Sequence, residues 1–126
     1  MTQILDTSVV LAYLLREPGS NQAEALLGDA QVSSVNFCEA ASKLMDFGHV
    51  PGLAWDRVIE MGLAVHPFDA ESARIAASLR PISRPYGLSF ADRACLALGI
   101  KLGLPVYTAD RAWAKLRIGV DIRLIR

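Results

Sequence analysis

Acidic side chains stand at two strand ends and in two early helical turns of this sequence. Asp6 directly follows the apolar run 3–5 and precedes a helical pattern, and Asp110 follows the segment LPVYTA in a similar way. Ligands of open α/β sheets bind outside the carboxyl ends of the strands, so we expect both acids at one edge of the sheet. Glu39 and Asp92 lie early in two helical segments. The joint placement of the four acids predicts one shared site.

Each acid also has an ordinary structural role that competes with this interpretation. Asp6 could cap the helix that follows it. Asp92 lies three residues after Ser89, which is the spacing of a capping box. Glu39 could be an exposed helical residue paired with Lys43 one turn later. No single acid therefore indicates a site, and the functional interpretation rests on the set.

The chemistry of four carboxylates in one cleft requires cations, because like charges raise one another's pKa values. Oxygen ligands select hard divalent ions, Mg²⁺ or Mn²⁺, over zinc. The two histidines, His49 and His66, are isolated in the sequence and form no competing cluster with a cysteine. A divalent ion held by carboxylates can lower the pKa of bound water and neutralise charge on a phosphoryl group. Phosphodiester hydrolysis is the natural use of such a site.

Alternating strands and helices must position these acids. Strands are expected at residues 3–5, around Val32, and at 63–68, 104–108 and 120–125; helices are expected at 9–15, 20–27, 34–47, 53–61, 70–79 and 89–102. Residues 51–52 are expected as a turn and residues 80–88, with two prolines and a glycine, as an exposed loop. This order predicts an α/β fold, a three-layer α/β/α sandwich with a mostly parallel central sheet.

Length and composition set the general class of the protein. The 126 residues are 52% hydrophobic and 21% charged, which is typical of one globular domain spanning residues 1–126. Cys38 and Cys95 match no metal or redox spacing and are expected as buried small hydrophobic residues of a reducing compartment. The segment MTQILDTS has no basic region or cleavage-like site, and no apolar run is long enough to cross a bilayer. We therefore expect a cytoplasmic protein that does not enter a membrane.

The zero net charge hides an asymmetry between the two halves. Residues 1–63 hold three bases against eight acids, whereas residues 64–126 hold ten bases against five acids. A polyanionic partner could use the basic half, although a solvated surface is the commoner meaning of such charges. Lys43, Arg93 and Arg111 each neighbour a proposed ligand, and they could contact the phosphate of a polyanionic partner or neutralise the acids. The aromatic residues Trp55 and Trp113 are expected to pack in the core or at a dimer contact.

Four segments of the chain resemble the signature blocks of a known family. The segments ILDTSVVLAYL, SSVNFCEAASKL, GLSFADRACLALG and LPVYTADRAW look like those of PIN-domain nucleases, and the likeness is closest to the VapC toxins of bacterial toxin–antitoxin pairs. The blocks appear in the right order and cover essentially the whole chain. By this likeness Asp6, Glu39, Asp92 and Asp110 carry over as the metal-binding and catalytic acids. Thr7, Ser8 and Thr108 resemble hydroxyl groups that orient the acids or a metal-bound water.

The resemblance implies a specific activity and specific partners. It implies an endoribonuclease that depends on Mg²⁺ or Mn²⁺ and cleaves structured RNA such as tRNA or rRNA. It also implies a homodimer that is inhibited by a cognate antitoxin, whose tail enters the active-site groove. Many relatives have a further acid soon after the fourth, whereas the segment RAWA follows Asp110 in this chain. This departure argues against a fully occupied second metal site.

Other classes of protein share the expected fold type. A response-regulator receiver needs paired acids after its first strand and a lysine after its fifth, and neither pattern is present. A phosphatase that forms an aspartyl-phosphate needs a second acid two residues after Asp6, where this chain has Ser8. A catalytically inactive PIN-like module that binds RNA or protein is the remaining alternative, and the presence of all four acids argues against it.

Overall fold

A five-stranded, fully parallel sheet forms the centre of the computed structural model, which describes residues 2–126. The strand order is β3-β2-β1-β4-β5. The strands span Gln3–Leu5 (β1), Ala30–Ser33 (β2), Ala64–His66 (β3), Val106–Thr108 (β4) and Ile122–Leu124 (β5). All four strand pairs are parallel, so the expected mostly parallel sheet is confirmed. The chain runs outward from β1 to β3 and then returns to the other side of β1 at β4.

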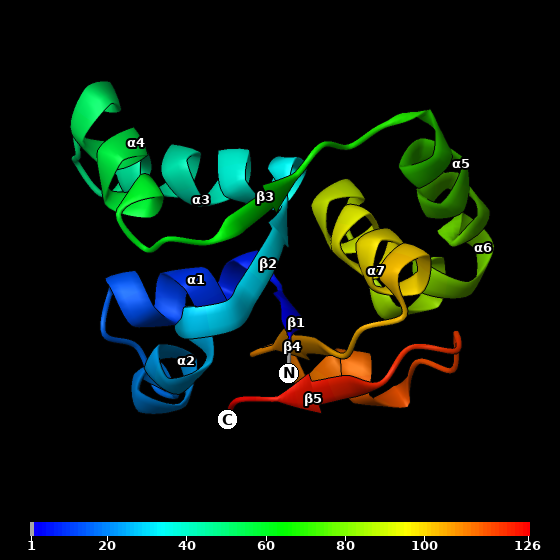
Figure 1. Cartoon of the computed structure of the whole chain (residues 1–126). Coiled ribbons are helices and arrows are strands. Elements are labelled where there is room, and N and C mark those ends of the chain that lie inside the picture. The colour runs from blue at the N-terminus through cyan, green and yellow to red at the C-terminus, as the bar shows by residue number, and fades with distance from the viewer. Residues whose placement is uncertain (1) are drawn as a thin grey trace.

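Helices cover both faces of the sheet and complete the expected three layers (Figure 1). One face carries α1 (Thr7–Leu14), α2 (Ser20–Leu26), α3 (Ser34–Asp46) and α4 (Pro51–Ile59), with the short 3-10 helix η1 (Leu27–Asp29). The other carries α5 (Ala70–Ser78), α6 (Arg80–Ser83) and α7 (Phe90–Leu102). Two further 3-10 helices are η2 (Arg84–Tyr86) and η3 (Arg111–Lys115). None of the helices within residues 2–126 is long and apolar enough to span a membrane.

Strand β1 contributes side chains to both halves of the core, because these side chains alternate between the two faces of the sheet. Leu5 packs in a buried cluster with residues of α1, α3 and α4, whereas Ile4 packs in a second buried cluster with α7 and Trp113. Helix α7 lies close to β4 at Gly99, where an added Cβ would come within 2.5 Å of the Val106 side chain. This close approach requires glycine, and it fixes the helix that carries Asp92 against the strand that precedes Asp110.

Three local expectations are wrong for identifiable reasons. Residues 51–52 are not a free turn, because Pro51 begins α4, where its fixed φ suits the first helical position. The segment 80–88 is mostly exposed, as expected, but it is not a loop, because α6 and η2 occupy most of it; Ser83 and Leu88 are buried. Cys95 is buried as expected, but Cys38 is exposed, since it lies on the solvent side of α3.

Candidate active site

The topology brings the ends of β1 and β4 together at the point where the strand order reverses. Leu5 pairs with Tyr107, and the Asp6 amide donates a hydrogen bond of 3.0 Å to the Tyr107 carbonyl. Asp6 therefore lies beside Thr108, directly beyond the carboxyl ends of adjacent parallel strands. This is the crevice in which open α/β sheets bind their ligands.

Asp6 occupies the N-cap position of α1, but its side chain accepts no capping hydrogen bond. Its Oδ2 atom instead accepts hydrogen bonds from the hydroxyl groups of Ser8 at 2.6 Å and Thr108 at 3.0 Å. The Ser8 hydroxyl is held in turn by the amide of Ala109, which donates to it at 2.9 Å. These contacts tie one carboxylate oxygen to both strand ends and fix its orientation.

The other oxygen of Asp6 is one of the buried polar atoms that lack a hydrogen-bond partner in the described part of the chain. Oδ1 is buried and has no hydrogen-bond partner within residues 2–126, and Asp6 as a whole is only 3% exposed. Burial raises the pKa of Asp6 from 3.8 to about 6, against the opposing hydrogen bond from Ser8, and the nearby Asp92 carboxylate raises it further. A buried carboxylate oxygen without a donor is expected to have a cationic partner.

The three remaining acids come from α3, α7 and the end of β4. Glu39 is partly exposed on α3, Asp92 is partly exposed in the first turn of α7, and Asp110 is exposed. Burial raises the pKa of Asp92, and the charges of Glu39 and Asp110 add to the shift. Because Asp92 also acts on Asp6, the electrostatic coupling extends over the whole set.

The competing structural roles are real for two of these acids. Ser89 and Asp92 form a reciprocal capping box, in which Asp92 Oδ2 accepts from the Ser89 amide at 2.9 Å. Asp110 Oδ1 accepts from the amide of Ala112 at 3.0 Å and caps η3. Each cap uses one carboxylate oxygen, so capping and ligand binding are compatible. Glu39 and Lys43 form no ion pair in the part of the chain that the structure describes.

All four acids line one cavity of about 430 Å³. Its wall also includes Thr7, Ser8, Leu11, Glu17, Lys43 and Ser89. Glu17 is a fifth acid that sequence reasoning missed, because only the turn after α1 brings it back to the cavity. Among the described residues no three acidic, histidine or cysteine side chains lie close enough to form a ready metal-binding group. The acids thus share a cavity but do not form a closed ligand shell.

Thr7 and Thr108 have different surroundings. Thr108 bonds Asp6 directly, whereas the Thr7 hydroxyl accepts a hydrogen bond of 3.0 Å from the side-chain amide of Asn36. The same amide group donates to the carbonyl of Ala91 at 3.2 Å, and Asn36 is fully buried. Asn36 therefore links α1, α3 and α7, each of which positions one acid of the cavity. Sequence reasoning missed this residue, since a lone asparagine in a helical pattern carries no signal.

The basic residues that neighbour the acids in sequence differ in whether they line the cavity. Arg93 donates to the carbonyl of Ala76 at 3.0 Å, so it joins α7 to α5 and neither pairs with an acid nor lines the cavity. Lys43 is exposed and lines the cavity, whereas Arg111 is exposed outside its lining. Trp113 is completely buried, which confirms core packing for this residue. Lys43 is thus the cation best placed to meet an anionic ligand.

The donor set fits a hard divalent cation. The polar wall of the cavity offers carboxylate and hydroxyl oxygens and contains neither histidine nor cysteine. Oxygen ligands of this kind suit Mg²⁺, Mn²⁺ or Ca²⁺. The unpartnered Oδ1 of Asp6 and the mutual repulsion between Asp92 and its neighbours both favour a positive ion at this place.

Several solved structures share the fold of this chain. A chain in the structure of VapBC2 from Rickettsia felis, bound to a DNA fragment from their promoter, has a TM-score of 0.75 at 17% identity, with 98% of each chain covered. For DNA-bound VapBC from Salmonella typhimurium the TM-score is 0.74 at 18% identity, with 100% of each chain covered. For a member of the VapBC family of toxin–antitoxin systems from Mycobacterium tuberculosis it is 0.62 at 24% identity, covering 99% of this chain and 98% of that one.

The sequence itself was also compared with known proteins and protein families. No curated protein matches it significantly. The family model described as PIN domain matches residues 4–119, which include most of β1, all of β4 and all four acids of the cavity. The structural similarities, at these low identities, show the fold alone, whereas the family match covers nearly the whole chain. The chain therefore belongs to the PIN domain family.

Proposed function

We propose that this protein is a divalent-metal-dependent endoribonuclease and the toxin component of a toxin–antitoxin pair. The observation that carries the proposal is the single cavity lined by Asp6, Glu39, Asp92 and Asp110 at the carboxyl end of a parallel sheet. The buried and unpartnered Oδ1 of Asp6 supports a cation in this cavity. PIN domains are typically nucleases, and the site has the acid chemistry that such an activity requires.

The toxin assignment rests on the fold neighbours and on the four sequence blocks. The solved structures named above are VapBC complexes, in which a toxin is paired with its antitoxin. By analogy we propose a cognate antitoxin as the protein partner of this chain, a homodimer as its assembly and structured RNA as its substrate. The cytoplasm is the compartment in which such a substrate and partner would be met.

Asp6, Glu39, Asp92 and Asp110 would hold the metal ion, and Mg²⁺ or Mn²⁺ is the proposed identity. Such an ion lowers the pKa of water and offsets negative charge on a phosphodiester. Glu17 lines the same cavity and could add a further oxygen. The segment after Asp110 contributes the buried Trp113 instead of another acid, which supports a single well-held ion.

The protein's own side chains would orient the reacting groups. The Ser8 and Thr108 hydroxyls hold Oδ2 of Asp6, so the position of this carboxylate is set before any ligand binds. Lys43, which lines the same cavity, would bind a non-bridging phosphate oxygen. Prepositioned groups of this kind lower the activation barrier because they need no reorganisation during the reaction.

Cleavage of RNA by the purified protein tests this function. With Mg²⁺ or Mn²⁺ we expect endonucleolytic cuts in a tRNA or rRNA stem-loop, and EDTA should abolish them. Asp6→Asn and Asp110→Asn should lower the rate by about 10²-fold or more, because they remove ligands of the ion. Glu71→Gln on α5, outside the lining of the cavity, is the matched control and should leave the rate unchanged.

The same variants can be compared in growing cells. Expression of the intact chain without its antitoxin should arrest growth, whereas the Asp6→Asn form should be tolerated. Cleavage that persists in EDTA, or equal toxicity of the two proteins, would contradict the proposal. The first result would indicate a metal-free nuclease, and the second would indicate inhibition by binding alone.

One observation supports a second candidate function, a PIN-like module that binds without catalysis. Within residues 2–126 no three acids stand close enough to hold a metal ion without movement. An inactive module would bind RNA or its protein partner equally well with and without divalent ions, and it would cleave no RNA. Both candidates would leave RNA intact in EDTA, so the cleavage assay with Mg²⁺ or Mn²⁺ separates them.

A further inference from the structure

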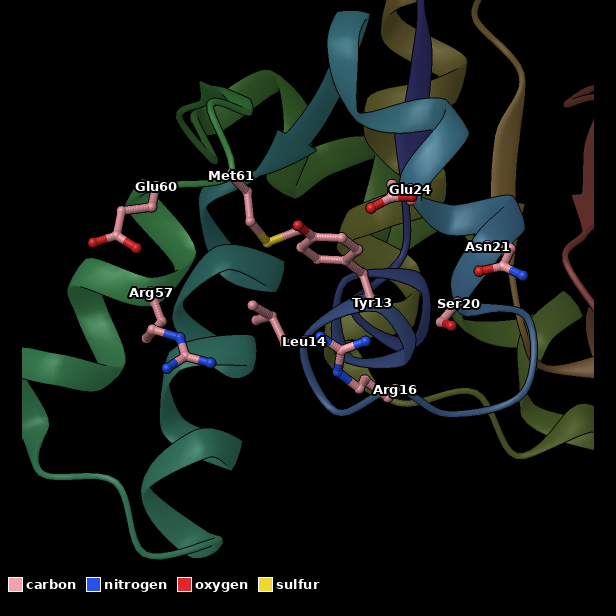
Figure 2. A pocket seen from close by; sticks show the side chains of 9 residues that line it. All are labelled: Tyr13, Leu14, Arg16, Ser20, Asn21, Glu24, Arg57, Glu60 and Met61. Atoms are coloured by element: carbon pink, nitrogen blue, oxygen red, sulfur yellow. The ribbon is translucent and has the colours of Figure 1, made fainter.

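A second cavity, of about 420 Å³, lies at the other end of α1. Its wall joins the last turn of α1, the first turns of α2 and the end of α4. Tyr13, Leu14 and Met61 contribute its apolar part, while Arg16 and Arg57 contribute two cationic groups. Figure 2 shows the two guanidinium groups on either side of Leu14. The cavity therefore presents two guanidinium cations beside an apolar surface.

Arg16 adopts a backbone conformation that strongly favours glycine. Its φ of 55° makes it the single non-glycine residue with a positive φ in the described part of the chain. It stands immediately after the C-cap of α1, and the amide of Glu17 donates to the carbonyl of Ala12 at 2.9 Å, as in a Schellman motif. An arginine here strains the backbone where glycine would not. Strain of this kind points to a role for the side chain.

Neither arginine is used inside the protein. Within residues 2–126 the guanidinium groups of Arg16 and Arg57 form no hydrogen bond or ion pair, although Glu24 and Glu60 line the same cavity. Figure 2 shows the Glu24 carboxylate on the far side of the Tyr13 ring from Arg16, and the Glu60 carboxylate apart from the Arg57 guanidinium group. The two cations therefore remain available to an external anion.

The few basic residues in the acidic half of the chain all lie at the two cavities. Residues 1–63 contain three bases, Arg16, Lys43 and Arg57, against eight acids. All three line one of the two cavities: Lys43 lines the acidic one, and the two arginines line the second. In a half that is otherwise negatively charged, the cations are thus concentrated where ligands can enter.

The two cavities meet at the turn that follows α1. Adjacent residues of this turn lie in different walls, since Arg16 lines the second cavity and Glu17 lines the acidic one. A chain molecule with one phosphate at the acid cluster could therefore continue past this turn toward the second cavity.

We propose that Arg16 and Arg57 form a binding site for a backbone phosphate of the RNA, on one side of the bond that is cleaved. The inference rests on the proposed function and extends it by naming the residues that select the path of the substrate. Arginine suits this task because its planar guanidinium group donates two parallel hydrogen bonds to phosphate oxygens. The carboxylates of Glu24 and Glu60 bound the site and confine the backbone to the side of the two arginines.

Binding of a stem-loop RNA tests the site separately from cleavage. The probe is a fluorescein-labelled tRNA anticodon stem-loop, and its binding is followed by anisotropy in Mg²⁺ buffer, with Asp6→Asn as the common background so that the RNA stays intact. Arg57→Gln and Arg16→Gly should each weaken binding by about three- to tenfold and reduce the slope of log K against log salt concentration by about 0.7. Arg74→Gln removes an equally exposed arginine on α5 and should change neither quantity.

The stability of Arg16→Gly supplies an independent readout. Because glycine relieves the left-handed strain, this variant should melt about 2–5 °C higher while it binds RNA more weakly. Arg16 and Arg57 variants that bind RNA like Arg74→Gln, or a background protein that binds no RNA, would overturn the proposal. Loss of antitoxin binding with unchanged RNA binding would overturn it too, and would assign the cavity to the protein partner. Failure of the intact chain to cleave RNA would instead count against the proposed function.

Discussion

The acids of the cavity differ in what their side chains do for the backbone. Asp92 and Asp110 each cap a helix with one oxygen, so they stabilise the fold whether or not a ligand is present. Asp6 caps nothing, is almost completely buried and keeps one oxygen without a partner within residues 2–126. In the absence of a cation its charge is a net cost to the folded state. This makes Asp6 the residue at which the proposed metal-binding role and the stability of the fold are most clearly opposed.

Replacing Asp6 with asparagine should therefore stabilise the metal-free protein. The amide can still accept hydrogen bonds from Ser8 and Thr108, and the buried charge disappears. We expect the free energy of unfolding in EDTA to rise by about 1–2 kcal/mol at neutral pH, measured by urea denaturation. Asp110→Asn is the control and should stay within about 0.5 kcal/mol, since Asp110 is exposed. A loss of several kcal/mol in Asp6→Asn would mean that Asp6 has a purely structural role.

The pH dependence of this gain follows from the direction of the pKa shift. The pKa of Asp6 in the folded chain, about 6, lies above its ordinary value of 3.8, so the folded state binds the proton more tightly. The free energy of unfolding of the metal-free protein should rise as the pH falls from about 7 to about 4. In Asp6→Asn most of this pH dependence should be absent. Asp92 shifts in the same direction. Asp29 and Asp69 have lowered pKa values, so their contributions are lost only at lower pH.

At the level of the elements, Asn36 holds together the three helices that position the acids. Its side chain joins α3 to Thr7 on α1 and to Ala91 on α7. Thr7 follows Asp6, Ala91 precedes Asp92, and Asn36 itself lies one turn before Glu39. A change at Asn36 should therefore alter the relative positions of the acids as well as the stability of the fold.

Asn36→Ala is expected to affect both properties. Removing the two hydrogen bonds should lower the free energy of unfolding by about 1–3 kcal/mol. The affinity for Mn²⁺ should fall by about tenfold, as expected when a residue that orients ligands is lost. Ser42→Ala on the exposed side of α3 removes one local hydrogen bond and should change neither quantity appreciably. A destabilised Asn36→Ala protein with unchanged Mn²⁺ affinity would show that Asn36 only packs.

The elements that could be predicted from the sequence are those with strong local signals. Ser89 and Asp92 form the capping box that their spacing predicts, and Asp69 caps α5. Residues 80–88 could not be predicted, because prolines and a glycine indicate a loop as readily as short helical turns. The buried Ser83 and Leu88 show that packing against neighbouring helices decides the conformation there.

For the whole molecule, the sequence predicts the fold class but not the strand order. Placing Asp6 and Asp110 at strand ends is possible from local patterns, whereas the adjacency of β1 and β4 follows only from the topology or from the family likeness. Glu17 reaches the cavity through the turn that follows α1, and Asn36 acts through contacts over more than twenty residues of sequence. Such contacts depend on tertiary packing and leave no spacing pattern behind.

Binding of Mn²⁺ by the intact protein, measured by calorimetry, tests the central claim most directly. The claim is that Asp6, Glu39, Asp92 and Asp110 act as one cation site. Each of Asp6→Asn, Glu39→Gln, Asp92→Asn and Asp110→Asn should weaken Mn²⁺ binding by about tenfold or more, as expected for lost ligands, while Glu71→Gln on α5 should bind like the intact chain. No measurable Mn²⁺ binding, or binding that survives all four substitutions, would contradict the account.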